Sequence, residues 1–219
     1  MAHFLVFLGT ARDSTLPAPA RLGLRVARAC VQLLEADGAK VELIDPLDIE
    51  LGNVFKPHFA YSISRVPEAL DSLAGKIEAA DGYVMVSPEY NHSMSPALSH
   101  LLNHFGSSLF AFKPSAIVTY SAGQWGGARA AVSMRTFLAE LGCLPVSAMI
   151  HVPKAQEALD EDGRFREDPD RWAGYFGRTL GQLTWWAEAA AEQRGKQDPT
   201  EVSPAFQRAP DQRNAPAAG

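Results

Sequence analysis

Several features that would place a protein in a particular class are missing from this sequence. It has only two cysteines, Cys30 and Cys143, in 219 residues, which excludes a disulfide-rich secreted scaffold. Both lie within apolar patterns, which are typical of buried free thiols. No apolar run approaches the roughly 20 residues that a membrane-spanning helix needs. The apolar stretch at residues 4–8 is too short for the core of a signal peptide. We therefore expect a cytoplasmic protein that has no membrane partner.

The sequence also lacks the charges and clusters of several functional classes. Its formal net charge is −5, so we expect no nucleic-acid partner. No paired carboxylates and no nucleophile with an adjacent base stand out. His100 and His104 have the one-turn spacing of metal ligands, but no third ligand is evident. We therefore predict no metal site, and we expect both histidines to be exposed or at an interface.

What the sequence does contain is an alternation of short apolar runs and helical patterns. The predicted strands are residues 3–8, 41–44, 83–86, 115–120 and 143–151. A segment with apolar residues at helical spacing follows each strand, and the last one is predicted to bury Trp172, Phe176, Thr179, Leu183 and Trp186 after an Asp168-Pro169 cap. This alternation predicts an α/β fold, a three-layer α/β/α sandwich around a five-stranded parallel sheet, for which we expect the order 2-1-3-4-5. Pro145 predicts that the fifth strand lies at an edge.

One domain is expected over residues 1–194. From about residue 195 the chain is rich in Gln, Pro, Ala, Arg and Asp and has no apolar periodicity. Such a segment cannot bury enough apolar surface to offset the entropy of ordering it. Residues 195–219 are therefore predicted to be a disordered tail.

Ligands of such sheets bind at the carboxyl ends of the strands, where the strand order reverses. The first loop at this edge, residues 9–22, supplies the hydroxyl of Thr10 and the cations of Arg12 and Arg21 just before a helix start. These groups suit a phosphate, although Gly-Thr after a strand is also an ordinary turn. The loop lacks both the P-loop and the Gly-x-Gly-x-x-Gly patterns, which argues against a nucleoside triphosphate and a classical dinucleotide fingerprint.

The second and third loops contain residues that a simple turn does not require. The second, residues 88–94, begins with Pro-Glu-Tyr-Asn; Pro88 is expected to end the strand, while Tyr90 and Asn91 suit a planar heteroaromatic ligand. The third, residues 121–126, combines the Ser121 hydroxyl with glycines that allow close approach of a ligand, or simply a flexible turn. A phosphate site and a ring site together fit flavin mononucleotide (FMN).

These segments resemble the NADPH-dependent FMN reductase family, which includes quinone and azo-dye reductases with a flavodoxin-like fold. The family's Pro-Glu-Tyr-Asn segment stands here as PEYNHSMSPAL (residues 88–98). Its Ser-x-Gly-x-x-Gly-Gly-Ala-Arg segment is SAGQWGGAR (residues 121–129), and its Gly-Ser/Thr-x-Arg loop is GTAR (residues 9–12). The resemblance covers roughly residues 3–190. It implies FMN and NADPH, or NADH, as cofactors and a homodimer or homotetramer.

The resemblance also implies the roles of individual residues. The FMN phosphate would be held by Thr10, Arg12 and Arg21, although an insertion containing two prolines lengthens this loop. The ribityl chain and one side of the isoalloxazine would be lined by Pro88, Glu89, Tyr90 and Asn91. The pyrimidine edge would meet Ser121, Gly123 and Gly126. No catalytic side chain is expected, because the flavin itself carries the chemistry.

The function implied is that of an FMN-dependent NAD(P)H oxidoreductase. Hydride would pass from NAD(P)H through FMN to a small-molecule acceptor such as a quinone, an azo compound or a metal ion. Two alternatives stay open. One is a flavodoxin-like electron carrier, although the first loop lacks the usual Thr-x-Thr-Gly-x-Thr of that class. The other is a regulatory flavoprotein of slow turnover, which the inserted loop and the polar tail would suit.

Overall fold

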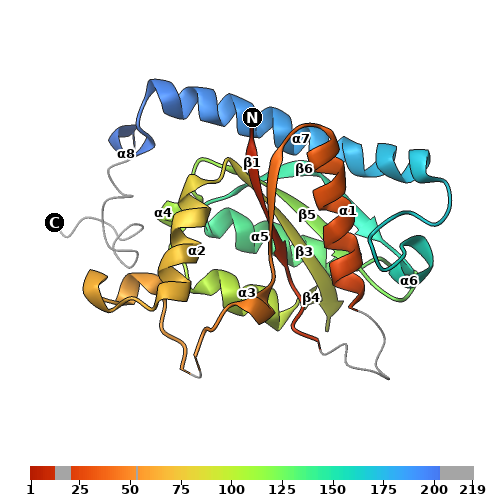
Figure 1. The fold of residues 1–219 in the computed structure, drawn as a ribbon, viewed down its shortest axis with the longest axis horizontal. Coiled ribbons are helices and arrows are strands. Elements are labelled where there is room, and N and C mark those ends of the chain that lie inside the picture. Colours follow the sequence, from red (N-terminus) through yellow and green to blue (C-terminus); the bar gives the residue numbers. More distant parts are fainter. Residues whose placement is uncertain (13–20, 53, 203–219) are drawn as a thin grey trace.

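Five parallel strands form the centre of the molecule (Figure 1). A computed structural model describes residues 1–12, 21–52 and 54–202. The parallel strands are β1 (His3–Leu8), β2 (Lys40–Ile44), β3 (Gly82–Tyr90), β5 (Pro114–Tyr120) and β6 (Leu144–Val152). Their order, β2-β1-β3-β5-β6, confirms the order predicted for five parallel strands. A sixth strand that was not predicted, β4 (Ser93–Met94), pairs antiparallel with β3.

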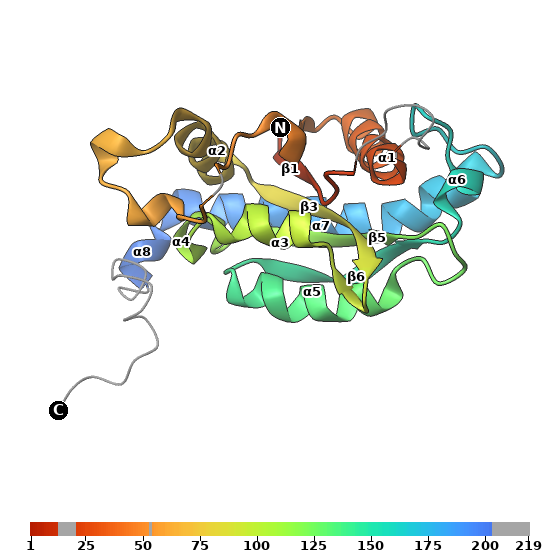
Figure 2. The same ribbon diagram turned by 90° about the horizontal axis from the view of Figure 1, so that it is seen from below.

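Helices cover both faces of the sheet, which confirms the predicted three layers (Figure 2). One face carries α1 (Leu22–Ala36) and α7 (Pro169–Lys196), and the other carries α2 (Glu68–Ala79), α3 (Pro96–Asn103) and α5 (Ala128–Glu140). Shorter helices are η1 (Pro46–Asp48), η2 (His58–Ala60), η3 (Ile63–Arg65), α4 (Ser107–Phe110), α6 (Ala155–Ala158) and α8 (Pro199–Val202). No helix in the described ranges is both long and apolar enough to cross a bilayer.

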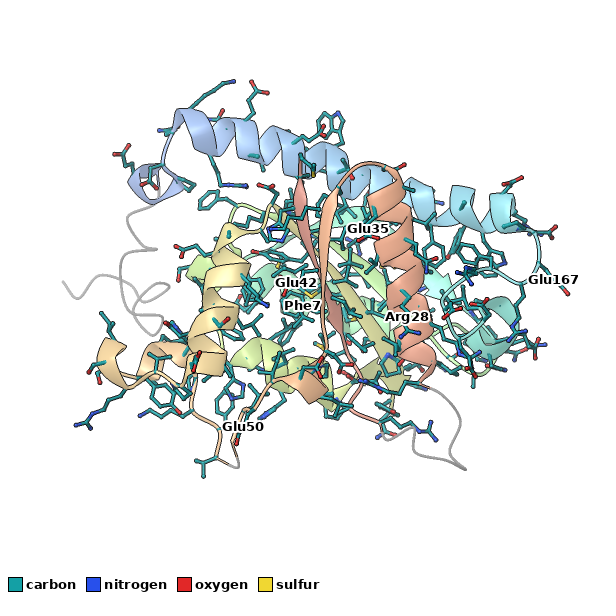
Figure 3. The ribbon with its side chains drawn as sticks, in the orientation of Figure 1. Phe7, Arg28, Glu35, Glu42, Glu50 and Glu167 are labelled. Atoms are coloured by element: carbon teal, nitrogen blue, oxygen red, sulfur yellow. The ribbon has the colours of Figure 1, made fainter. Side chains whose placement is uncertain are left out.

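Alternate residues of β1 supply the two halves of the core. Phe4 and Val6 pack toward α1 and α7, whereas Leu5 and Phe7 pack toward α2, α3 and α5, as the two-residue period of a strand requires. Phe7 lies near the middle of the molecule (Figure 3), with its ring 6.2 Å from that of Tyr83. A central strand of a parallel sheet is covered by helices on both faces, so it needs apolar side chains on both faces.

The two cysteines, and the proline near the start of the last strand, behave as predicted. Cys30 and Cys143 are buried and free, and burial raises the pKa of each thiol to about 12. Thiols with such a pKa stay protonated near neutral pH, so neither is a reactive nucleophile. Pro145 lies near the start of β6, which is one of the two edge strands of the parallel sheet.

The prediction that Pro88 ends the third strand is wrong. β3 continues to Tyr90, and Pro88 pairs with Tyr120 of β5. The pairing of β1 with β3 stops at Val86, so β3 has become an edge strand at Pro88, where a missing N–H is tolerated. β3 then turns back into β4 through Asn91 and His92, whose φ values of 50° and 63° match a two-residue type I′ hairpin turn.

Helix α7 differs from its predicted burial pattern at its ends. Phe176, Thr179 and Leu183 are buried as expected, but Trp186 is 42% exposed and Ala187 takes the buried position beside it. Pro169 begins the helix, whereas Asp168 makes no side-chain capping bond and has a left-handed backbone. α7 runs two residues past the expected domain boundary at 194, and α8 follows it; the remainder of the predicted tail, residues 203–219, lies outside the described residues.

His104 is fully buried, so the expectation of an exposed or interfacial position is wrong for this histidine. Its Nδ1 donates to the carbonyl of His100 at 2.8 Å, while its Nε2 is buried and has no hydrogen-bond partner within residues 1–12, 21–52 and 54–202. The ring of Phe55 packs edge-on against it at 4.8 Å. Within the part of the chain that the structure describes, no group of three or more potential metal ligands occurs.

Acidification is expected to destabilise the fold through His104. Burial lowers the pKa of His104 below its ordinary value of 6.5, so the unfolded chain binds more protons than the folded one as the pH falls through that value. The contribution of neutral His104 is therefore complete above about pH 6.5 and is lost as the pH falls through the lowered pKa. His104→Phe, which keeps the ring packing, should reduce the loss of unfolding free energy between about pH 7.5 and pH 5.5, measured by urea titration.

The exposed neighbour supplies the control for this experiment. His100→Phe should change the pH dependence of stability less than His104→Phe does, because His100 is exposed and its charge lowers the pKa of His104 less than burial does. Equal pH dependence in wild type and His104→Phe would show that His104 does not carry the effect.

Candidate active site

The three predicted loops meet at one edge of the sheet, below the carboxyl ends of β1, β3 and β5 (Figure 1). Gly9, the first residue after β1, donates its N–H to the carbonyl of Val86 in β3 at 2.7 Å. The hydroxyl of Ser95, which caps α3, donates to the carbonyl of Gly9 at 2.5 Å. The first and second loops are thus joined by direct hydrogen bonds. Residues 13–20 of the first loop lie outside the described residues.

Arg21 is held at the start of α1 by a partner that sequence reasoning missed. Its guanidinium contacts both carboxylate oxygens of Asp45, at 2.6 and 3.0 Å, and also donates to the carbonyl of Thr10. Both side chains of the ion pair are mostly buried, at 8% and 15% exposure, and the Arg21 Nε is buried without a partner among the described residues. Asp45 directly follows β2 at the same edge of the sheet, which is the signal that could have indicated it.

Tyr120, the last residue of β5, lies beneath the start of α1. A Cβ added to Gly23 would come within 2.3 Å of the Tyr120 hydroxyl, so only glycine allows this approach. Burial raises the pKa of the Tyr120 hydroxyl, and Tyr90 raises it further; a hydrogen bond from Thr10 and the charges of Arg21 and Arg12 act in the opposite direction. These effects place Thr10 and both arginines around one tyrosine.

The start of α1 is suited to an anion. Among the described residues, no side chain caps this helix and no acidic residue occupies its first turn. The backbone N–H groups at a helix start carry partial positive charge and need acceptors. Together with Arg12, Arg21 and the Thr10 hydroxyl they form a set of donors that fits a phosphate.

The predicted ligand residues of the second loop differ in their roles: Pro88, Glu89 and Asn91 hold the structure together, and Tyr90 is exposed. The carboxylate of Glu89 accepts from Arg129 twice, from Nε at 2.8 Å and from the backbone N–H at 3.1 Å, so it links β3 to the first turn of α5. Asn91 forms the hairpin turn. Pro88 is buried within β3, while the ring of Tyr90 is 46% exposed. Tyr90 is therefore the residue of this loop that offers an open aromatic surface.

The third loop is held by its own hydrogen bonds. The Ser121 hydroxyl donates to the carbonyl of Gly123 at 2.8 Å and accepts from the N–H of Gly126 at 3.0 Å. Gly126 has a φ of 57°, and its added Cβ would lie 3.0 Å from the backbone nitrogen of Pro153, so glycine is required there by the fold. A Cβ on Gly123 would meet nothing within 4 Å in the part of the chain that the structure describes. Gly123 thus borders space that the described residues leave open.

These residues fit the two ends of FMN. Cationic and N–H donors gather at the start of α1, and an exposed ring and an open glycine lie at the ends of β3 and β5. The model of one protein family, described as NADPH-dependent FMN reductase, matches residues 3–157. The chain belongs to this family.

Individual relatives agree with the family match. This FMN reductase family member is 33% identical over 138 residues to the NAD(P)H-dependent FMN reductase PA1204 of Pseudomonas aeruginosa, over 61% of this chain and 72% of the relative. It is 37% identical over 81 residues to a quinone reductase of Escherichia coli, over 36% of this chain and 43% of that protein. Its fold is similar to that of FerB, a flavoenzyme NAD(P)H:(acceptor) oxidoreductase from Paracoccus denitrificans, with a TM-score of 0.65 and 21% identity, covering 86% of this chain and 98% of the other.

Family membership confirms the resemblance seen in the sequence. The protein is an FMN-dependent, NAD(P)H-dependent oxidoreductase with a flavodoxin-like fold, as predicted. Sequence reasoning missed the structural partners Asp45 and Tyr120, which belong to no motif, and it missed the pairing of Arg129 with Glu89, although Arg129 ends the SAGQWGGAR segment. Each becomes visible only when strands distant in the sequence lie side by side.

Proposed function

We propose that this FMN reductase passes electrons from NAD(P)H to a small organic acceptor of the quinone type, and that the ten residues predicted from its three loops form the FMN site. The observation that carries the proposal is the meeting of an uncapped, arginine-flanked helix start with an exposed tyrosine and an open glycine at one edge of the sheet. The similarity to a quinone reductase, over less than half of that protein, supports the choice of acceptor.

At the phosphate end, the protein would supply a preorganised set of donors. Thr10 and Arg12 would contact the phosphate oxygens together with the first N–H groups of α1. Arg21 would add its charge from a fixed position, because Asp45 and the Thr10 carbonyl already hold its guanidinium. Part of that charge is neutralised by Asp45, which makes Arg12 the stronger attraction for an anion.

At the ring end, the protein would orient the flavin and leave one side of it open to substrates. Tyr90 would pack along the isoalloxazine, and Ser121, Gly123 and Gly126 would bring backbone groups to its pyrimidine edge. Pro88, Glu89 and Asn91 would keep the hairpin and the start of α5 in place beside it. Bound FMN supplies the chemistry, accepting a hydride from NAD(P)H and passing electrons on to the acceptor.

Steady-state turnover tests this function. Purified protein loaded with FMN is expected to oxidise NADPH rapidly when a benzoquinone is supplied, with NADPH absorbance as the measurement. Protein without added FMN provides the control for the cofactor. Stable FMN binding without appreciable turnover would instead support an electron carrier or a slow regulatory flavoprotein. The predicted homodimer or homotetramer and the predicted cytoplasmic location stay predictions.

A further inference from the structure

A cavity lies beside the third loop, outside the residues assigned to FMN. It has a volume of about 400 Å³ and lies between the end of β6 and the start of α7. Its lining consists of His151, Pro153, Asp168, Arg171, Trp172 and Tyr175. Glu167, labelled in Figure 3, marks the segment of chain that leads into this part of α7.

Two aromatic rings form one wall of the cavity. Trp172 stacks on Phe165 with a centroid distance of 5.6 Å and an interplanar angle of 6°, and Tyr175 meets Trp172 edge-on at 5.9 Å. Phe165 is not among the residues that line the cavity, so its contact with the Trp172 ring lies outside the cavity. A planar ligand in the cavity would extend this stack.

His151 offers a hydrogen-bond acceptor to the same cavity. The Thr119 hydroxyl donates to the carbonyl of Gly126 at 2.8 Å, so the Nδ1 of His151, which lies 2.7 Å from that hydroxyl, must be the donor between them. Burial lowers the pKa of His151, which favours the neutral ring near pH 7. In the neutral ring with a proton on Nδ1, Nε2 is an acceptor, and no described residue donates to it.

Arg171 supplies an uncommitted cation at the edge of the cavity. Its side chain is exposed and has no ion pair or hydrogen bond with any described residue. An arginine guanidinium is suited to bind a phosphate through two hydrogen bonds. Asp168 is the one carboxylate among the lining residues, and it would repel a phosphate but accept from a hydroxyl or an amine.

The cavity is joined to the loop assigned to the flavin. Pro153 lines it, and its nitrogen lies 3.0 Å from the position of a Cβ on Gly126. The next residue, Lys154, donates its backbone N–H to the carbonyl of Gly123 at 2.9 Å. One ligand with two ring systems linked by a pyrophosphate could therefore reach both the open side of Gly123 and this cavity.

We propose that the cavity holds the adenosine end of NADPH, with the adenine against Trp172 and Tyr175, its exocyclic amine donating to His151 Nε2, and the 2′-phosphate on Arg171. This inference rests on the proposed function, because it assigns a binding site to the adenosine half of NADPH, which is the hydride donor of that reaction. It makes Arg171 the residue that favours NADPH over NADH.

Binding of nucleotide fragments tests the inference without any turnover. Calorimetric titration of the FMN-loaded protein should show binding of 2′,5′-ADP that is weakened about tenfold or more by Arg171→Gln, the size expected for a lost hydrogen bond between charged groups. Binding of 5′-AMP should be weakened much less, because it has no 2′-phosphate. Arg178→Gln, an exposed arginine further along α7, is the matched control and should change neither titration. Asp168→Asn should strengthen binding of 2′,5′-ADP, since it removes a like charge.

Kinetics with the two coenzymes separate this inference from the proposed function. Arg171→Gln should raise the KM for NADPH about tenfold more than the KM for NADH. Rapid NADPH oxidation together with 2′,5′-ADP binding that is insensitive to Arg171 would overturn the inference and leave the function intact. Loss of 2′,5′-ADP binding in Arg171→Gln, in a protein that does not oxidise NADPH, would support the pocket and overturn the function.

Discussion

Gly9→Ala is expected to destabilise the protein by about 3 kcal/mol, the upper end of the usual cost of overpacking. The added Cβ would lie 2.5 Å from the carbonyl oxygen of Val86 and 3.1 Å from the Cβ of Leu98. The same carbonyl accepts the N–H of Gly9, so the clash and the hydrogen bond cannot both persist. Because the obstructing atom belongs to the backbone of a central strand, no change of side-chain rotamer relieves it. Urea unfolding measures the effect.

Gly75→Ala is the matched control for this substitution. Gly75 lies within α2, and an added Cβ there would meet nothing within 4 Å. Alanine should stabilise this helix by about 0.5–1 kcal/mol. FMN binding should weaken in Gly9→Ala, since Gly9 carries Thr10 into the site, and should be unchanged in Gly75→Ala. An unfolding midpoint of Gly9→Ala equal to that of the wild type would contradict the close approach of β1 and β3.

Arg21→Met is expected to cost about 3–5 kcal/mol of stability, because it leaves the mostly buried Asp45 carboxylate without its partner. It should also weaken FMN binding, since a cation beside the phosphate is lost. Chemical unfolding and a titration of flavin absorbance measure the two effects. A single substitution cannot separate them, because a distorted loop would also bind FMN poorly.

The double substitution Arg21→Met/Asp45→Asn makes that separation. Removing both charges should restore much of the lost stability, whereas FMN binding should stay weak. Riboflavin, which lacks the phosphate, should bind wild type and variants with similar affinity. Arg12→Gln should lower FMN affinity alone, because Arg12 has no ion pair with any described residue. Equal losses for FMN and riboflavin would refute the phosphate role of both arginines.

Local patterns were sufficient to predict the strands and the loops that follow them, whereas the strand order was a hypothesis that the structure confirms. Strands such as residues 3–8 and 115–120 are short, apolar and followed by helices, and a right-handed crossover rule leaves few ways to arrange them. Capping by Ser95 was also predictable, because a serine before a proline at a helix start acts through neighbours in the sequence. Pro88 was misread because its effect depends on where the neighbouring β1 ends.

The sequence by itself determined which segments form strands and helices and which three loops lie at the edge where a ligand binds. Only the tertiary structure decided what each side chain in those loops does. Asp45 and Arg21 are 24 residues apart, and Glu89 and Arg129 are 40 apart, so neither pair leaves a local signal. The physical reason is that apolar periodicity acts over one helical turn or one strand, whereas ion pairs and close glycine contacts form only after the strands have paired.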